Sequence, residues 1–130
     1  MKKCALPGLI GDWIECINRG DADRLVQFMS PGHTFYVDGE QPTVGPTLNL
    51  EAWRGYFAAF PHYLIFVDDV YEDNGTYYVL GHTQGSHVPA ELESIPRSVI
   101  WKVGLDVATI SEWIIYDGSK RADLGLPDYV

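Results

Sequence analysis

Two aspartates and one histidine are the side chains in this sequence whose positions suggest proton transfer. Asp38 follows the apolar run Phe35-Tyr36-Val37 and precedes a glycine, so a short strand over residues 34–37 would place it at the rim of a sheet. If Asp38 projects into an apolar interior, loss of solvation raises its pKa toward that of a general base. The alternative is that Asp38 bonds the backbone of its own turn, as aspartate before glycine readily does.

Asp117 is the second carboxylate candidate, at the end of a strand predicted over residues 108–117. Side chains alternate along a strand, so Trp113, Ile115 and Asp117 share one face. This mainly apolar triplet suits a pocket wall, where Asp117 would act as an acid or a base. The alternative is that Asp117, followed by Gly118, simply ends the strand and turns the chain.

His82 is the third candidate, because a histidine in a pocket can carry protons near neutral pH. His82 and His87 lie five residues apart on one predicted strand, so they point to opposite faces and cannot bind one metal together. The alternative for His82 is a structural hydrogen bond. His33 and His62 flank turns and are expected to be exposed. The sequence shows no metal-ligand spacing and no glycine-rich phosphate motif, so we expect neither a metal nor another cofactor.

Helices come first among the elements that must position these residues. Apolar residues at helical spacing predict a first helix that ends at Gly20 and a second helix that Asp21 caps. The second helix includes Met29 and ends at residues 30–32. A third helix is capped by Asn49 and stopped by the proline at residue 61.

Strands follow in the second half of the chain. Asn74-Gly75 separates two runs rich in β-branched and aromatic residues, 63–71 and 76–82, and predicts a hairpin with a type I′ turn. Residues 98–105 and 108–117 predict a second hairpin. The tail is expected to be irregular, with three apolar side chains packing back on the domain: Leu124, Leu126 and Tyr129.

Length, charge and cysteine content limit the class of protein. Residues 1–130 are the size of one domain, and helices followed by strands indicate an α+β fold. A net charge of −9, with only nine lysines and arginines, weighs against binding of nucleic acid or of an anionic membrane surface. Two cysteines are too few for a disulfide framework, so we interpret them as reduced thiols of a cytoplasmic protein. No segment is long enough to span a bilayer.

Several short motifs together resemble a known family. They are Trp13…Asn18-Arg19-Gly20-Asp21-Ala22-Asp23, Phe35-Tyr36-Val37-Asp38, Gly45…Trp53…Phe57…Phe60-Pro61, Gly81-His82-Thr83-Gln84-Gly85-Ser86-His87 and Ile110-Ser111-Glu112-Trp113-Ile114-Ile115-Tyr116-Asp117. The set covers nearly the whole chain and resembles the SnoaL-like branch of the nuclear transport factor two superfamily, which also includes ketosteroid isomerase, scytalone dehydratase and limonene epoxide hydrolase. The resemblance implies three N-terminal helices packed on a strongly curved antiparallel sheet, which together form a cone with an internal pocket.

The resemblance also bears on the candidate residues. Asp38 occupies a place similar to that of the catalytic aspartate of ketosteroid isomerases. SnoaL-like cyclases pair an aspartate near the end of the last strand with a histidine, similar to Asp117 and His82 here. Trp13 and Trp101 stand where the isomerases carry a phenol and a protonated aspartate, so steroid isomerisation is not expected.

Aromatic residues indicate the class of ligand. Six of them, from separate elements, are expected to converge on the interior, although each is equally suited to an ordinary core: Trp13, Tyr36, Trp53, Phe57, Trp101 and Trp113. They favour a flat, apolar or aromatic small molecule. The leading interpretation is a cofactor-independent enzyme that uses carboxylate acid–base chemistry, of isomerase, cyclase, dehydratase or hydrolase type. The alternatives are a non-catalytic binder of an apolar ligand and a dimeric interaction module with a vestigial pocket.

Strand alternation predicts a homodimer as well, which the resemblance also implies. If Trp113 and Ile115 face the pocket, Ile114 and Tyr116 face outward together with Ile100. This arrangement leaves an apolar patch on the outer face of the sheet, of a kind that a monomer rarely exposes.

Overall fold

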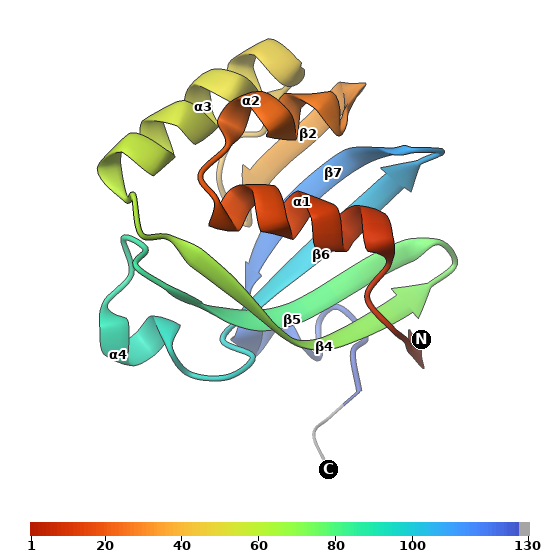
Figure 1. The fold of residues 1–130 in the computed structure, drawn as a ribbon. Coiled ribbons are helices and arrows are strands. Elements are labelled where there is room, and N and C mark those ends of the chain that lie inside the picture. Colours follow the sequence, from red (N-terminus) through yellow and green to blue (C-terminus); the bar gives the residue numbers. More distant parts are fainter. Residues whose placement is uncertain (128–130) are drawn as a thin grey trace.

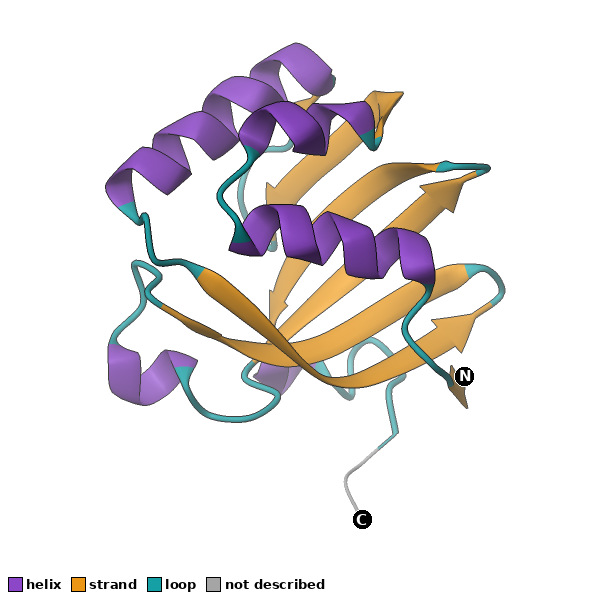
Figure 2. Cartoon of the chain, viewed as in Figure 1, coloured by secondary structure: helices purple, strands orange, loops and turns teal. Residues whose placement is uncertain are grey.

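The computed structural model, which describes residues 1–127, has three helices on one face of a β-sheet, as the predicted α+β class requires (Figures 1 and 2). These helices are α1 (Gly8–Asn18), α2 (Ala22–Gln27) and α3 (Pro46–Ala59). The strands are β1 (Lys2–Lys3), β2 (Met29–Val37), β3 (Thr43–Val44), β4 (Leu64–Asp73), β5 (Thr76–Gln84), β6 (Val99–Asp106) and β7 (Thr109–Asp117). A short helix, α4 (Ala90–Glu93), lies between β5 and β6, and a 3-10 helix, η1 (Gly118–Lys120), follows β7. None of the helices in this part of the chain has the length and apolar character needed to cross a membrane.

The sheet formed by residues 1–127 has seven strands in the order β1-β4-β5-β6-β7-β2-β3. Neighbouring strands are antiparallel except β2 and β7, which run parallel, so the expectation of a fully antiparallel sheet is wrong at this pair. Most of the chain lies between these two strands, and such a long connection allows either direction. The sheet is twisted and open, with the two-residue strands β1 and β3 at its edges, and it is less curled than the implied cone (Figure 1).

The two predicted hairpins are confirmed. Asn74 and Gly75, between β4 and β5, have φ angles of 50° and 86°, the positive values of a type I′ turn. β6 and β7 form the second hairpin. The ladders place Trp101 of β6 beside Val79 of β5 and Ile115 of β7, and this register determines which face each side chain occupies.

The first two helices begin and end close to the predicted residues. Gly20 has a φ angle of 67° just after α1, a conformation that glycine adopts without strain. The side chain of Asp21 caps α2 by accepting a hydrogen bond from the backbone N–H of Arg24 at 3.1 Å.

The third helix begins earlier than predicted. α3 starts at Pro46, because a proline fits the first turn of a helix and Gly45 precedes it with a φ angle of 93°. Asn49 therefore does not cap the helix but is buried within it. Its amide nitrogen donates to three backbone carbonyls, which ties α3 to β2 and β3: those of His33, Thr43 and Gly45.

β2 is longer than predicted. It begins at Met29, which was expected in the second helix, and runs through Pro31 and Gly32, where a turn was expected. A bulge in this segment keeps the strand beside β7. His33, expected to be exposed, is fully buried, and its Nδ1 lies 2.7 Å from the carbonyl oxygen of Ile110. Burial lowers the pKa of His33, so the imidazole is neutral at pH 7.

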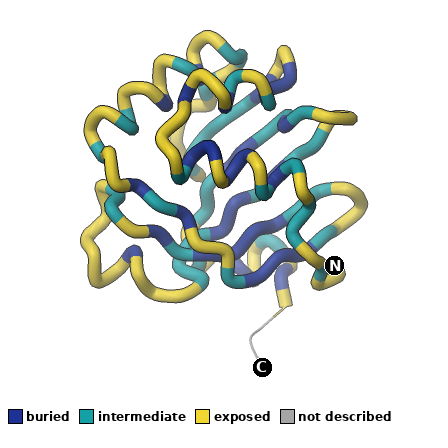
Figure 3. The backbone as a smooth tube through the Cα atoms, in the orientation of Figure 1, coloured by how far each residue is buried: buried dark blue, intermediate teal, exposed yellow. Residues whose placement is uncertain are grey.

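The main core lies between the helices and the sheet. Trp13, Trp101 and Trp113 are fully buried there, and the ring of Trp113 lies 5.8 Å from each of the other two. Figure 3 shows the buried segments concentrated in the middle strands and in α1, which faces them. Three indole rings thus pack together between the helix layer and the sheet.

The segment after β7 covers part of the opposite face of the sheet. As predicted for the tail, Leu124 and Leu126 pack there against a small cluster of Tyr71, Tyr78, Leu80, Ile100 and Tyr116. The expected packing of Tyr129 lies outside the described residues. Ile100 and Ile114 are 0% and 1% exposed, so the expected apolar patch around them is wrong, because side chains of the same molecule already cover both.

Candidate functional site

A cavity of about 550 Å³ lies between α3 and the helix-facing side of the sheet. α3 forms one wall, β2, β6 and β7 form the floor, and the end of β5 with the segment after it closes one end. Within residues 1–127 the lining consists of Phe35, Val37, Glu40, Ala52, Trp53, Tyr56, Tyr63, Thr83, Ser86, His87, Val88, Val99, Trp101 and Ile115. The cavity is therefore mainly apolar, with a few polar groups.

Strand alternation selects the side chains of the floor. Trp101 pairs with Ile115 in the β6–β7 ladder, and Val99 lies on the same face two residues before Trp101. Phe35 and Val37 extend this face into β2, where they lie beside the residues of β7. The parallel β2–β7 pair is thus part of the cavity floor.

Aromatic rings form the side walls. The ring of Trp53 on α3 lies 5.7 Å from that of Phe35, and the ring of Tyr56, also on α3, lies edge-on 5.1 Å from that of Tyr63. Burial raises the pKa of both Tyr56 and Tyr63. Both phenols therefore stay protonated at neutral pH and can donate hydrogen bonds.

A tyrosine and a histidine pair at the polar end of the cavity. The phenol oxygen of Tyr56 lies 2.9 Å from Nδ1 of His87, and it also accepts the backbone N–H of His87 at 3.4 Å. Either the phenol donates to Nδ1 or a protonated Nδ1 donates to the phenol oxygen. His87 itself is exposed, and its Nε2 makes no hydrogen bond within residues 1–127.

Glu93 on α4 lies behind this end of the cavity as a buried carboxylate. Its Oε2 accepts hydrogen bonds from the hydroxyl of Thr83 at 2.8 Å and from both the backbone N–H and the hydroxyl of Ser86. Burial alone raises the pKa of Glu93, but the hydrogen bonds from Ser86 and Thr83 outweigh it and hold the pKa below its ordinary value. Glu93 is ionised at neutral pH and orients two hydroxyl groups of the lining.

The two predicted aspartates lie outside the cavity lining. Asp38 is exposed directly after β2 and, by alternation, lies on the face opposite to Val37, toward Tyr116. The structure therefore does not give Asp38 the apolar surroundings that were expected for it. Asp117 is exposed at the end of β7 and pairs with Val99, which places it at the edge of the cavity-facing side.

His82 lies on the opposite face of the sheet from the cavity, because the next residue, Thr83, lines the cavity. Its Nδ1 lies 2.9 Å from a carboxylate oxygen of Asp68, and its ring stacks on that of Phe66 at 5.0 Å. The same oxygen of Asp68 accepts the backbone N–H of Arg97. His82 thus helps to hold the segment before β6 against β4, and it does not meet the other candidates.

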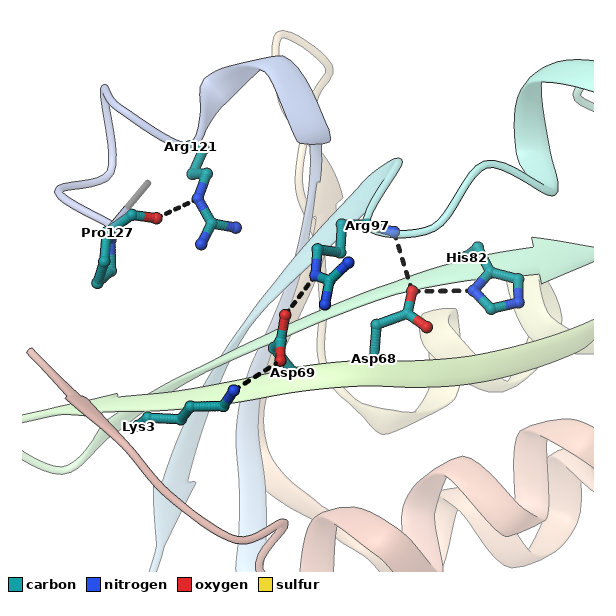
Figure 4. Close-up of polar contacts among 7 residues, drawn as sticks. All are labelled: Lys3, Asp68, Asp69, His82, Arg97, Arg121 and Pro127. Carbon is teal, nitrogen blue, oxygen red and sulfur yellow. Dashed lines mark hydrogen bonds and ion pairs between the residues drawn. The ribbon is translucent and has the colours of Figure 1, made fainter. Parts of the chain in front are cut away.

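Asp69 holds the same region from the neighbouring position. It is buried and pairs with Lys3 of β1 at 3.2 Å and with Arg97 (Figure 4). Burial alone raises the pKa of Asp69, but the contacts with Arg97 and Lys3 hold it below its ordinary value.

In the C-terminal segment Arg121 donates to the carbonyl of Pro127. Among residues 1–127 no group of three or more histidine, cysteine, aspartate or glutamate side chains is placed to hold a metal.

The six aromatic residues expected at the ligand fall into three groups. Trp53 and Trp101 line the cavity. Trp13, Phe57 and Trp113 belong to the core beside it, and Tyr36 lies on the opposite face of β2.

Several lining residues were missed by the sequence analysis, above all Tyr56, Tyr63 and His87. Tyr56 comes three residues after Trp53 and therefore lies on the same side of α3, which the helical spacing could have indicated. His87 lies beyond the end of β5, where strand alternation no longer applies, so the pattern carried no signal for it.

Residues 10–112 match the sequence profile of the SnoaL-like domain. No curated protein matches the chain at a significant level. Three solved structures illustrate the likeness in fold. The candidate polyketide cyclase SMa1630 of Sinorhizobium meliloti has a TM-score of 0.70 at 16% identity and covers 85% of this chain and 94% of its own.

The other two structures are slightly more distant in sequence. The candidate SnoaL-like polyketide cyclase of Shewanella putrefaciens has a TM-score of 0.70 at 11% identity, covering 91% of this chain and 84% of its own. The epoxide hydrolase/cyclase-like enzyme SalBIII, described in pyran ring formation in the polyether salinomycin, has a TM-score of 0.67 at 13% identity, covering 84% and 87%. At these identities the likeness shows the fold alone.

Proposed function

Because this chain belongs to the SnoaL-like domain family, we propose that it is an enzyme that binds a small apolar or aromatic molecule in the cavity and moves protons on it without a cofactor. The reaction is of the isomerase, cyclase, dehydratase or hydrolase type. The names of the similar structures, two candidate polyketide cyclases and an epoxide hydrolase/cyclase-like enzyme, support this range of chemistry. The proton carrier is His87, paired with Tyr56.

One observation carries the proposal: a hydrogen-bonded phenol and imidazole lie at the polar end of an otherwise apolar cavity. When Nδ1 of His87 donates to the phenol oxygen of Tyr56, Nε2 is free to accept a proton from a bound molecule. When the phenol donates to Nδ1 instead, Nε2 carries a hydrogen and can donate it. The pair can therefore act as a base and as an acid within one reaction.

5-Nitrobenzisoxazole is a suitable probe, because it is flat and neutral and a base needs only to remove its acidic C–H proton. The N–O bond then opens and a coloured nitrophenolate is released. We expect the protein to accelerate this ring opening, and His87→Gln to lower the rate about 100-fold. His82→Gln is the matched control, since that imidazole lies on the opposite face, and its rate should equal that of the wild type. Equal rates for wild type and His87→Gln would contradict the assignment.

The same assay tests the carboxylates predicted from the sequence. Asp38→Asn should leave the rate unchanged, because the exposed Asp38 does not line the cavity. Asp117→Asn should have a small effect, because Asp117 lies at the edge of the cavity-facing side. A loss in Asp117→Asn as large as that in His87→Gln would identify Asp117 as the base.

A non-catalytic binder of an apolar ligand is the second candidate. The observation that favours it is that the three residues predicted for catalysis all lie outside the cavity lining. Binding of 5-nitrobenzisoxazole without faster ring opening would support this reading. The third reading, an interaction module with a vestigial pocket, is disfavoured because side chains do not fill the cavity.

A homodimer through the outer face of the sheet stays a proposal that the resemblance supports. Sedimentation of the wild-type protein measures its oligomeric state directly.

The two free cysteines, Cys4 and Cys16, agree with the proposed cytoplasmic location.

A further inference from the structure

We infer that the cavity selects a ligand whose polar group donates hydrogen bonds and carries no negative charge, with a primary ammonium group as the best fit. This chemical class rests on the proposed function, in which the cavity binds a small molecule. The polar end of the cavity leaves hydrogen-bond acceptors free and brings negative charge close to them.

Two of the hydroxyl groups in the lining, those of Thr83 and Ser86, have already used their protons. Thr83 and Ser86 both donate to Oε2 of Glu93, and a hydroxyl has one proton to give. Only lone pairs therefore remain on these oxygens. Ser86 also accepts the backbone N–H of Val88 at 3.0 Å, so Thr83 keeps the larger capacity to accept. A ligand N–H or O–H group finds a partner at these oxygens, whereas a carboxylate oxygen finds none.

The Tyr56–His87 pair does not reverse this preference. The proton between the two side chains can sit on either atom, so the pair offers a donor or an acceptor as the ligand requires. The fixed part of the recognition comes from Thr83 and Ser86, whose orientation Glu93 sets.

The charges around the cavity have one sign. None of the lining residues within 1–127 is lysine or arginine, whereas Glu40 belongs to the lining and Glu93 lies directly behind Thr83 and Ser86. Glu93 is almost fully buried, at 5% exposed, so water screens its charge weakly. An anionic ligand would be repelled, and a cation would be attracted.

The aromatic walls add to the attraction for a cation. Five rings line the cavity: Phe35, Trp53, Tyr56, Tyr63 and Trp101. The face of an aromatic ring carries partial negative charge and attracts an ammonium group, most strongly where water is excluded. The rings also stack on a flat ligand body, so one molecule can satisfy both features.

Three probes with the same naphthalene ring test the inference: 2-naphthylmethylamine, 2-naphthalenemethanol and 2-naphthoate. Calorimetric titration at pH 7 measures their Kd values. We expect the amine to bind at least tenfold more tightly than 2-naphthoate, with the alcohol in between. NMR signals of the indole N–H groups of Trp53 and Trp101 should shift with the amine, which places it in the cavity.

Charge variants connect the preference to Glu93. Glu93→Gln keeps the shape of the side chain but removes its charge, and should lower the ratio of naphthoate to amine Kd at least threefold. Glu91→Gln removes the same charge from an exposed position of α4 and should leave the ratio unchanged. If Glu93→Gln does not fold, Glu40→Gln replaces it and should also lower the ratio.

Three results would overturn the inference. If 2-naphthoate binds as tightly as the amine, or if neither charge variant changes the ratio, the ligand class is wrong while the proposed small-molecule cavity stands. If none of the three probes binds to the folded protein, both the ligand class and the proposed function fail.

Discussion

The imidazole of His33 is enclosed by the core, with its ring 5.3 Å from that of Trp13. The carbonyl oxygen of Ile110 can only accept, so the hydrogen of the neutral ring is on Nδ1 and donates to it. Nε2 is then an acceptor without a partner within residues 1–127. Protonation of this nitrogen would place an unpaired charge in the core, so the fold selects the neutral form of His33.

The free energy of unfolding should therefore fall in mild acid. Folding lowers the pKa of His33, so below the ordinary value of 6.5 the unfolded chain binds more protons than the folded one. We expect a loss of up to about 1.4 kcal/mol per pH unit as the pH falls below 6.5. Glu93 and Asp69 have lowered pKa values, so their contribution begins to fall only below their ordinary values of 4.5 and 3.8 and is lost as the pH falls through the lowered values of the folded protein.

Urea unfolding at pH 7, 6 and 5 measures this dependence. His33→Phe should flatten it, because the titrating group is gone, whereas His62→Gln at an exposed position should retain it. A wild-type free energy of unfolding that stays constant over this range would contradict the prediction.

Only part of the cavity lining could be predicted from the sequence. Trp53 and Trp101 were predicted to reach the ligand and do line the cavity, because helical spacing and strand alternation are local rules. The choice between His82 and His87 depends on where β5 ends and how the next segment folds back on Tyr56. Such a contact forms between distant parts of the chain and leaves no periodic pattern in the sequence.

At the scale of elements, β5 approaches its neighbours closely because residue 81 is glycine. A Cβ atom there would lie 2.0 Å from the carbonyl oxygen of Phe66 in β4 and 2.9 Å from the ring of Trp101. The first contact involves backbone, which cannot move without disturbing the β4–β5 ladder. Gly81 thus sets the depth to which the Trp101 ring sits beneath the cavity.

Gly81→Ala should lower the free energy of unfolding by about 1–3 kcal/mol, the cost of forcing extra atoms into a filled site. Gly32→Ala is the matched control, because that glycine also lies in a strand and a Cβ there would meet no atom within 4 Å. Urea unfolding of both variants measures the difference. Equal stability of the two would contradict the steric argument.

Elements with local signals were predictable, and elements without them were not. The β4–β5 hairpin follows from Asn74-Gly75, whose positive φ angles specify the turn. The two-residue strands β1 and β3 are too short to show a pattern, and both exist only because β4 and β2 offer an edge. The parallel partner of β2 is set by long-range packing, which neither propensity nor alternation encodes.

At the scale of the whole molecule, the outer face of the sheet is not the open apolar surface that a dimer argument requires. Ile114 is almost fully buried within one chain, so Ile114→Glu should destabilise the fold by several kcal/mol instead of only separating subunits. Ile95→Glu is the control, because Ile95 is 51% exposed and its replacement should leave the melting temperature nearly unchanged. Thermal melts of both variants test this, and a stable, folded Ile114→Glu monomer would restore the dimer argument.

The parallel pairing of β2 with β7 joins the first long strand to the last, with Phe35 beside Trp113. During synthesis α1 and β2 leave the ribosome before any residue of β7 exists, so Trp13 at first has no Trp113 to pack against. Pairing across so much of the chain is slow to form and leaves apolar surface open meanwhile. A nascent chain that stalls before residues 109–117 therefore has no complete cavity floor, and its indole rings are presented to chaperones instead of to a ligand.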